Sequence, residues 1–200
     1  MASRASDEKA KKLLEAASSG NLHAFIEVAK ELDVKAIKDA NGLSAFHLGS
    51  FHGRTNICQY FVEDLGFHVD FLSPNGETPL FRAAMGGHVV TARYLINHGA
   101  NTVASDEEGL TPLHYAARYG QVPLLKFLLS LGVPVDVKVK HASGSPLIVA
   151  AIYGQESCMK VLLEHHADVN CAIINDCTPL FLSVSAGSLS PSFSSRRVLI

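Results

Sequence analysis

The residues of this 200-residue sequence that could bind a metal or act as nucleophile and base are ten histidines and four cysteines. A zinc site needs several such ligands close together, commonly with two cysteines in a CxxC pair. The cysteines share no such spacing: Cys58, Cys158, Cys171 and Cys177. His165 and His166 are adjacent at a predicted helix end, which is a poor arrangement for two ligands of one metal. The sequence therefore predicts no metal site and no cofactor.

Catalytic motifs give the same result. The sequence contains no nucleophile elbow G-x-S-x-G, no P-loop and no dinucleotide-binding glycine fingerprint. The segment Gly49-Ser50-Phe51-His52-Gly53 places a serine near a histidine, but its serine stands where other parts of the chain have a small, packed alanine. We therefore expect a protein that is not an enzyme.

An internal repeat explains where these residues stand. Six glycines recur at intervals of 33, 34, 33, 34 and 33 residues: Gly20, Gly53, Gly87, Gly120, Gly154 and Gly187. Four of them follow a Thr/Ser-Pro-Leu sequence, which begins at Thr78, Thr111, Ser145 and Thr178. A Ser or Thr hydroxyl can cap the first turn of a helix, and proline is favoured directly after the cap. A period of this length is typical of proteins in which each unit packs on its neighbours.

Each unit predicts two helices separated by the periodic glycine. The first helix carries small residues that permit close packing, as in Ala83-Ala84 and Ala116-Ala117. The second carries large apolar pairs that form a buried stripe, as in Leu95-Ile96 and Leu128-Leu129. About ten residues rich in Asp, Asn and Gly then form a turn or short hairpin before the next unit. The predicted fold class is all-α, a solenoid of paired antiparallel helices with hairpin-like connectors.

The order of cap, proline, leucine, alanine pair, glycine, leucine pair and glycine resembles the ankyrin repeat, most completely over residues 111–132. The resemblance covers residues 8–187, about five and a half repeats. It leaves residues 1–7 as a disordered N-terminus and 188–200 as an irregular or truncated C-terminal tail. In this family His47 and His114 stand where histidine makes hydrogen bonds within and between units, so we expect them to be structural.

A weaker resemblance concerns plant proteins that join an ankyrin array to tetratricopeptide repeats. Residues 38–42, 66–70 and 162–168 carry it. In that group the second part implies co-chaperone-like tethering, although this sequence contains no tetratricopeptide repeat. The alternative function is therefore a regulatory or targeting segment of a longer multidomain protein.

Composition bears on partners and location. The net charge of −2 and the short basic runs argue against nucleic acid, and no stretch approaches the roughly 18 apolar residues that span a bilayer. Cysteines without paired spacing are typical of a reducing compartment. We expect a monomer in the cytoplasm, with the nucleus as a second location, that does not insert into membranes.

The resemblance implies that the chain is a scaffold or adaptor that binds a protein partner. In the family, variable residues lie just before the periodic glycine and at the connector tips, along a concave groove. The candidates before the glycines are Phe51, His52, Met85, Arg118, Tyr119, Ile152 and Tyr153. Those at the tips are Glu107, Glu108, His141 and Ile174. For Phe51 and Ile152, packing against the next unit is an alternative that stays open.

One modification site is also predicted. Asn170 follows Asp168 and Val169 and resembles the ankyrin asparagines that an asparaginyl hydroxylase modifies in animals. The alternative is an asparagine that only stabilises its turn.

Overall fold

The structure, a computed structural model, describes residues 2–137 and 144–170. Within these ranges it contains ten α-helices, one π-helix and no strand. The inner helices are α1 (Ala2–Ser19), α3 (Ala45–Phe51), α5 (Pro79–Gly86), α7 (Pro112–Arg118) and α9 (Pro146–Ile152). The outer helices are α2 (Leu22–Ala29), α4 (Thr55–Gln59) with the π-helix η1 (Tyr60–Asp64), α6 (Val89–Asn97), α8 (Val122–Ser130) and α10 (Glu156–Glu164).

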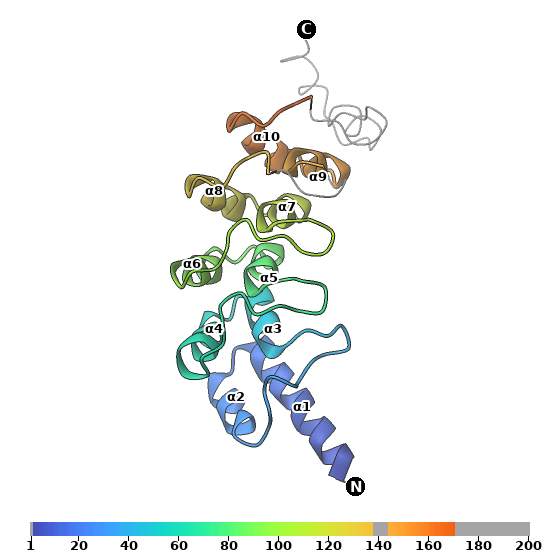
Figure 1. The fold of residues 1–200 in the computed structure, drawn as a ribbon, viewed down its shortest axis with the longest axis vertical. Coiled ribbons are helices and arrows are strands. Elements are labelled where there is room, and N and C mark those ends of the chain that lie inside the picture. Colours follow the sequence, from blue (N-terminus) through green and yellow to red (C-terminus); the bar gives the residue numbers. More distant parts are fainter. Residues whose placement is uncertain (1, 138–143, 171–200) are drawn as a thin grey trace.

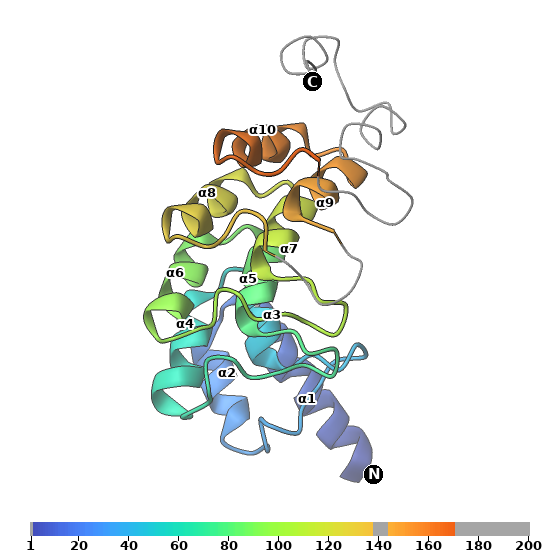
Figure 2. The same ribbon diagram turned by 45° about the horizontal axis from the view of Figure 1, so that its top comes forward.

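The two kinds of helix form two columns. Each inner helix contacts the next inner helix, and from α4 onward each outer helix contacts the next outer one (Figure 1). The connectors project together on the side of the inner helices, as Figures 1 and 2 both show. This is the predicted all-α solenoid. Gly187 and the tail predicted at 188–200 lie outside the described residues.

The first helix differs from the other inner helices. α1 has 18 residues, whereas the later inner helices have seven or eight. It begins at Ala2 and so extends into the segment 1–7, for which the sequence predicts disorder.

Small and large apolar residues divide the core as expected. The alanine pairs of α5, α7 and α9 are fully buried, which lets consecutive inner helices approach closely. Leu95, Leu128 and Leu162 of the outer helices are also fully buried. In the first two units aromatic rings fill much of the core, and Phe46 and Phe61 stack at a centroid distance of 5.0 Å.

The helix caps differ from the prediction. Of the four Ser/Thr residues before the inner helices α3, α5, α7 and α9, Ser145 accepts the Ile148 N–H as expected. Thr111 forms a capping box with His114, whose Nδ1 lies 2.9 Å from the Thr111 hydroxyl and accepts the Thr111 N–H at 3.2 Å. Ser44 instead bonds to the His47 imidazole at 2.8 Å. Thr78 Oγ1 is buried and has no partner among the described residues. In the second unit the histidine therefore binds the hydroxyl that would otherwise cap the helix.

A π-turn accounts for the extra residue in the second unit. The Leu65 N–H donates to the Tyr60 carbonyl at 3.0 Å, five residues back rather than four. A π-turn places one additional residue in a helix without breaking its hydrogen-bonded backbone. Phe61 therefore stays fully buried while Gly66 moves one position along the chain.

The periodic glycines are required for two reasons. Gly120 has φ +70°, a conformation that costs other residues about 1 kcal/mol or more. A Cβ at Gly120 would also lie 2.4 Å from Oε1 of Gln155, which follows the next periodic glycine. The same close approach joins Arg54 to Gly20, His88 to Gly53 and Gln121 to Gly87.

Three of these side chains also donate to the carbonyl two residues before the glycine that they cover. Arg54 Nε donates to Ser18, Gln121 Nε2 to Met85 and Gln155 Nε2 to Arg118, at 2.9, 2.9 and 3.1 Å. We call this set of side chains, each lying on the preceding unit's glycine, the glycine ladder. It bonds neighbouring units at the ends of α1, α5 and α7.

The connectors fold back as tight turns. Asp39, Ser73 and Asp106 each donate a backbone N–H to a carbonyl four residues on, at 2.9–3.0 Å. Their side chains accept backbone N–H groups of the same turn. A turn also forms where His166 replaces the expected glycine, since this residue adopts φ +64°.

The ladder predicts that two glycine variants with similar backbone strain differ in stability. Gly132 has φ +82°, but a Cβ added there would meet no atom within 4 Å, so Gly132→Ala should cost about 1 kcal/mol of unfolding free energy. Gly120→Ala should cost roughly 2–3 kcal/mol, because Gln155 must also give up its bond to Arg118. Urea unfolding measures both. If the two variants lost equal unfolding free energy, Gly120 would not be needed to make room for Gln155. The same would follow if the two losses still differed by as much in a Gln155→Ala background.

Candidate functional site

The predicted partner-binding residues do not all lie together. Five of them line one pocket of about 350 Å³ between two connectors and the ends of α5 and α7: Met85, Glu107, Glu108, Arg118 and Tyr119. Four further residues that the sequence did not single out complete its wall: Asn75, Glu77, Asp106 and Tyr115. The pocket thus joins a helix end and a connector tip from neighbouring units.

Comparison of the units could have identified Glu77 from the sequence. Glu77 stands two residues before the Pro of its unit, where the second and fourth units have Leu43 and Leu110. All three side chains are buried. A carboxylate in a place that leucine fills in other units is not required by the fold, and this contrast could have identified it.

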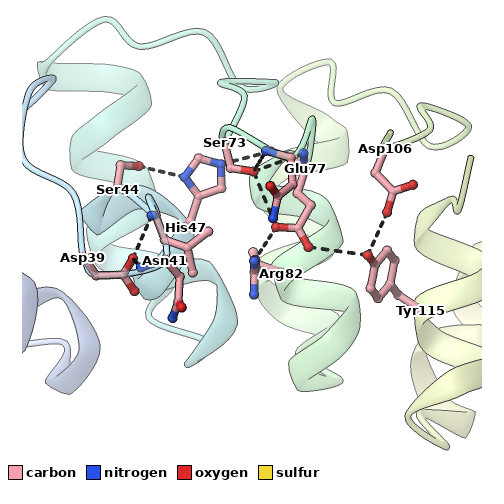
Figure 3. A network of polar contacts seen from close by, with 11 residues as sticks. Asp39, Asn41, Ser44, His47, Ser73, Glu77, Arg82, Asp106 and Tyr115 are labelled. Carbon is pink, nitrogen blue, oxygen red and sulfur yellow. Dashed lines mark hydrogen bonds and ion pairs between the residues drawn. The ribbon is translucent and has the colours of Figure 1, made fainter. Parts of the chain in front are cut away.

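A polar network holds the carboxylates of the pocket (Figure 3). Glu77 pairs through Oε2 with the Arg82 guanidinium, and it accepts a bond from Ser73. The Tyr115 hydroxyl lies 2.7 Å from Asp106 Oδ2 and 3.4 Å from Glu77 Oε1. Burial and the carboxylate of Asp106 raise the pKa of Tyr115, so the phenol keeps its proton.

Aromatic rings and a guanidinium continue from the pocket toward α9. The rings of Tyr115 and Tyr119 are parallel, with centroids 6.4 Å apart. The Arg118 guanidinium lies 4.7 Å from the centroid of the Tyr153 ring, and 5.7 Å from that of Tyr119. Tyr119, Ile152 and Tyr153 are 43–47% exposed. Arg118 therefore points toward the next unit, and its guanidinium makes cation–π contacts with two exposed rings.

The other candidates lie elsewhere. Phe51 and His52 pack edge to face at 5.0 Å near the end of α3, with Phe51 half-buried and His52 exposed. His141 and Ile174 lie outside the described residues. Asn170 is exposed, and its backbone N–H donates to Asp168 Oδ1 at 2.9 Å, a bond that involves the side chain of Asp168 and not that of Asn170. Hydroxylation of Asn170 stays a prediction.

His47 and His114 connect neighbouring units. The His47 Nε2 lies 3.1 Å from the Glu77 carbonyl, and the His114 Nε2 lies 3.2 Å from the Gly144 carbonyl. Because a carbonyl only accepts, Nε2 carries the proton, and Nδ1 is left to accept from Ser44 or Thr111. Burial lowers the pKa of both imidazoles to about 4, so they are neutral near pH 7.

The described cysteines are unsuited to nucleophilic chemistry. Cys58 and Cys158 are fully buried in outer helices. Burial raises the pKa of their thiols to about 12 and about 11, so almost no thiolate forms at neutral pH. Among the described residues no group of three or more His, Cys, Asp or Glu side chains could hold a metal ion, and no helix is long and apolar enough to cross a membrane.

Known proteins share the repeat sequence and the helical fold of this chain. Residues 65–141 match a family model described as ankyrin repeats in three copies, and residues 147–190 match a second described as ankyrin repeats in many copies. The crystal structure of the human ASB11 ankyrin repeat domain superposes with a TM-score of 0.72 at 32% identity, over 86% of this chain and 76% of that domain. The chain belongs to the ankyrin-repeat family.

Curated relatives are much longer than this ankyrin array. Human SH3 and multiple ankyrin repeat domains protein 2 is 29% identical over 90% of this chain and 11% of its own length. The Saccharomyces cerevisiae target of rapamycin complex 2 subunit AVO2 is 35% identical over 64% of this chain and 30% of its own. The palmitoyltransferase AKR1 of Lachancea kluyveri is 33% identical over 54% and 15%. The chain therefore spans between a tenth and a third of these relatives.

The two histidines predict how stability depends on pH. Their pKa values are about 4 in the folded protein and near 6.5 when unfolded, so only the unfolded chain takes up their protons between these values. Their contribution is fully present above pH 6.5 and is lost as the pH falls to 4, on the order of 3 kcal/mol for each. Chemical denaturation at several pH values measures this.

A matched pair of variants separates the histidines from the carboxylates, which also titrate at low pH. His114→Gln should lower stability at pH 7 and flatten the profile between pH 6.5 and 4. The exposed His23→Gln should leave the profile unchanged. A His114→Gln profile parallel to that of the wild type would show that this imidazole does not stay neutral in the folded protein.

Proposed function

We propose that the chain is a non-catalytic adaptor that binds a protein partner through the surface formed by the ends of the inner helices and the connector tips. Ankyrin repeats in general mediate protein–protein interactions, and this proposal assigns the contact to one part of the array. The observation that carries it is the set of exposed side chains Tyr119, Ile152 and Tyr153, with the half-buried Arg118 between the two tyrosine rings, beside the pocket.

These side chains are of the type that dominates interface energies. Tyr and Arg are enriched among the few residues that carry most of the affinity, and they cluster in places that exclude water. The Arg118 guanidinium is already held over two rings, so little side-chain entropy remains to be lost on binding.

A regulatory or targeting role within a longer protein is the second candidate. Its support is that this chain aligns with only 15% of the palmitoyltransferase AKR1, an enzyme by its name, and with 11% of the human multiple-ankyrin protein. In that case the same surface would bind either another part of the longer protein or its target. A monomer in the cytoplasm or nucleus is part of the proposal.

The proposed surface predicts the effect of one double variant. Arg118→Ala with Tyr119→Ala should weaken partner binding by roughly two orders of magnitude, because it removes two anchors from one contact. The melting temperature should change little, since the Arg118 group that Gln155 binds is its carbonyl. Affinity purification with mass spectrometry identifies the partner, and titration of the purified pair measures the loss.

The control removes a similar pair from an outer helix. Lys126→Ala with Leu131→Ala takes away one basic and one large apolar side chain, both exposed, at α8. It should leave binding unchanged. Full binding by the Arg118/Tyr119 variant, or equal losses in the two variants, would refute the assignment of the surface.

A further inference from the structure

The pocket beside α5 and α7 contains a buried carboxylate oxygen whose hydrogen-bonding capacity is not used. Glu77 is more than nine-tenths buried and lines the pocket. The Tyr115 hydroxyl is its only partner at Oε1 among the described residues, at 3.4 Å. That hydroxyl has one proton, and the much shorter contact of 2.7 Å gives it to Asp106. Figure 3 draws both contacts of this hydroxyl, and because its single proton goes to Asp106, Glu77 Oε1 keeps most of its capacity to accept a hydrogen bond.

A buried carboxylate oxygen with only one long contact to a shared donor is costly, and the repeat shows that the fold does not need it. Leu43 and Leu110 fill the place of Glu77 in the second and fourth units. The place of Arg82 holds Leu48, Tyr115 and Val149 in the second, fourth and fifth units. A buried ion pair can often be replaced by apolar residues without loss of stability. The Glu77–Arg82 pair has thus been introduced into a position where an apolar contact suffices.

The remaining wall of the pocket determines what would fit. Asp106, Glu107 and Glu108 bring three more carboxylates to the same side. Met85 and the exposed ring of Tyr119 form the apolar part of the wall. Two basic groups adjoin these carboxylates: Arg82 pairs with Glu77 Oε2, and Arg118, which also lines the pocket, has its guanidinium over the Tyr153 ring. The four lining carboxylates outnumber these two cations. The pocket volume of about 350 Å³ is at the small end of ligand sites, which span roughly 300–1,000 Å³.

We propose that this pocket binds an arginine side chain carried by a peptide segment of the protein partner. The guanidinium donates to Glu77 Oε1 and to the neighbouring Asp106 and Glu107 carboxylates, while the aliphatic stem packs on Met85 and Tyr119. Arginine fits better than lysine because its planar guanidinium offers several donors in a fixed fork and stacks on aromatic rings. The inference rests on the proposed function, since it names the chemistry of the partner at that surface.

The pocket can be tested without knowing the partner. The probe is N-acetyl-arginine-N-methylamide, titrated into the full 200-residue chain and followed by NMR. We expect saturable shifts of the Met85, Glu107 and Tyr119 signals with a dissociation constant on the order of millimolar, which is typical of a single side chain. The lysine analogue should bind more weakly. The citrulline analogue, which has the same shape without the charge, should bind about 10-fold more weakly or not at all.

Two variants show whether Glu77 is the acceptor. Glu77→Gln should weaken the arginine probe about 10-fold or more. The second variant, Glu77→Leu with Arg82→Leu, places leucine at both positions, as in the second unit, so it should keep its melting temperature and lose the probe. Glu164→Gln, an exposed carboxylate at the end of α10, is the control and should bind normally. Equal shifts with citrulline, or normal binding by a folded Glu77→Leu/Arg82→Leu chain, would overturn the proposal.

This experiment is separate from the test of the adaptor function. If the probe does not bind while a partner still depends on Arg118 and Tyr119, the arginine pocket is wrong and the adaptor surface stands. If the probe binds at Glu77 while the Arg118/Tyr119 variant keeps its partner, the adaptor surface is wrong and the pocket chemistry stands.

Discussion

The contact between the periodic glycines Gly20, Gly53, Gly87 and Gly120 and a side chain of the following unit is the constraint on which the rest of the described structure depends. An inner helix can pass directly into an outer helix only if the residue at the turn adopts a positive φ. Gly87 and Gly120 do so, and the glutamine of the next unit occupies the space that a Cβ would fill. The glutamine amide then bonds the preceding carbonyl. One glycine therefore sets both the turn inside a unit and the spacing between units.

The outer side of the array shows the same dependence on neighbouring units. Asn101 and Asp168 donate their N–H groups to Asp70 and Asp136 of the preceding units, at 3.0–3.3 Å. In the fourth unit the corresponding donor place holds Pro134, which has no N–H, and the acceptor place before it holds Val103. A carboxylate there would have no donor to bind. Donor and acceptor thus vary together, as expected where each unit packs only on its neighbours.

Much of the fold could be predicted from the sequence because it follows from periodic residues. Small residues such as Ala116 and stripe residues such as Leu128 are buried where the period placed them. The caps were less predictable, because Ser44 and Thr111 had two partners within reach and the imidazole competed with the backbone. The pocket was only half predictable. Variable positions indicated Arg118 and Glu107, but the role of Glu77 depends on Tyr115, which lies 38 residues away in sequence.

The placement of Glu77 also explains why the polar network crosses several units. Its carbonyl accepts from His47 in the second unit, its carboxylate binds Arg82 in its own unit, and its remaining oxygen faces Tyr115 in the fourth. Glu77 is anchored at its backbone carbonyl and at Oε2, so its carboxylate has little freedom to rotate toward another donor. Its unused oxygen is thereby fixed in direction, and a site that is fixed before binding loses little entropy when a ligand arrives. The stacking that makes the array stable is therefore also what orients the charge in the pocket.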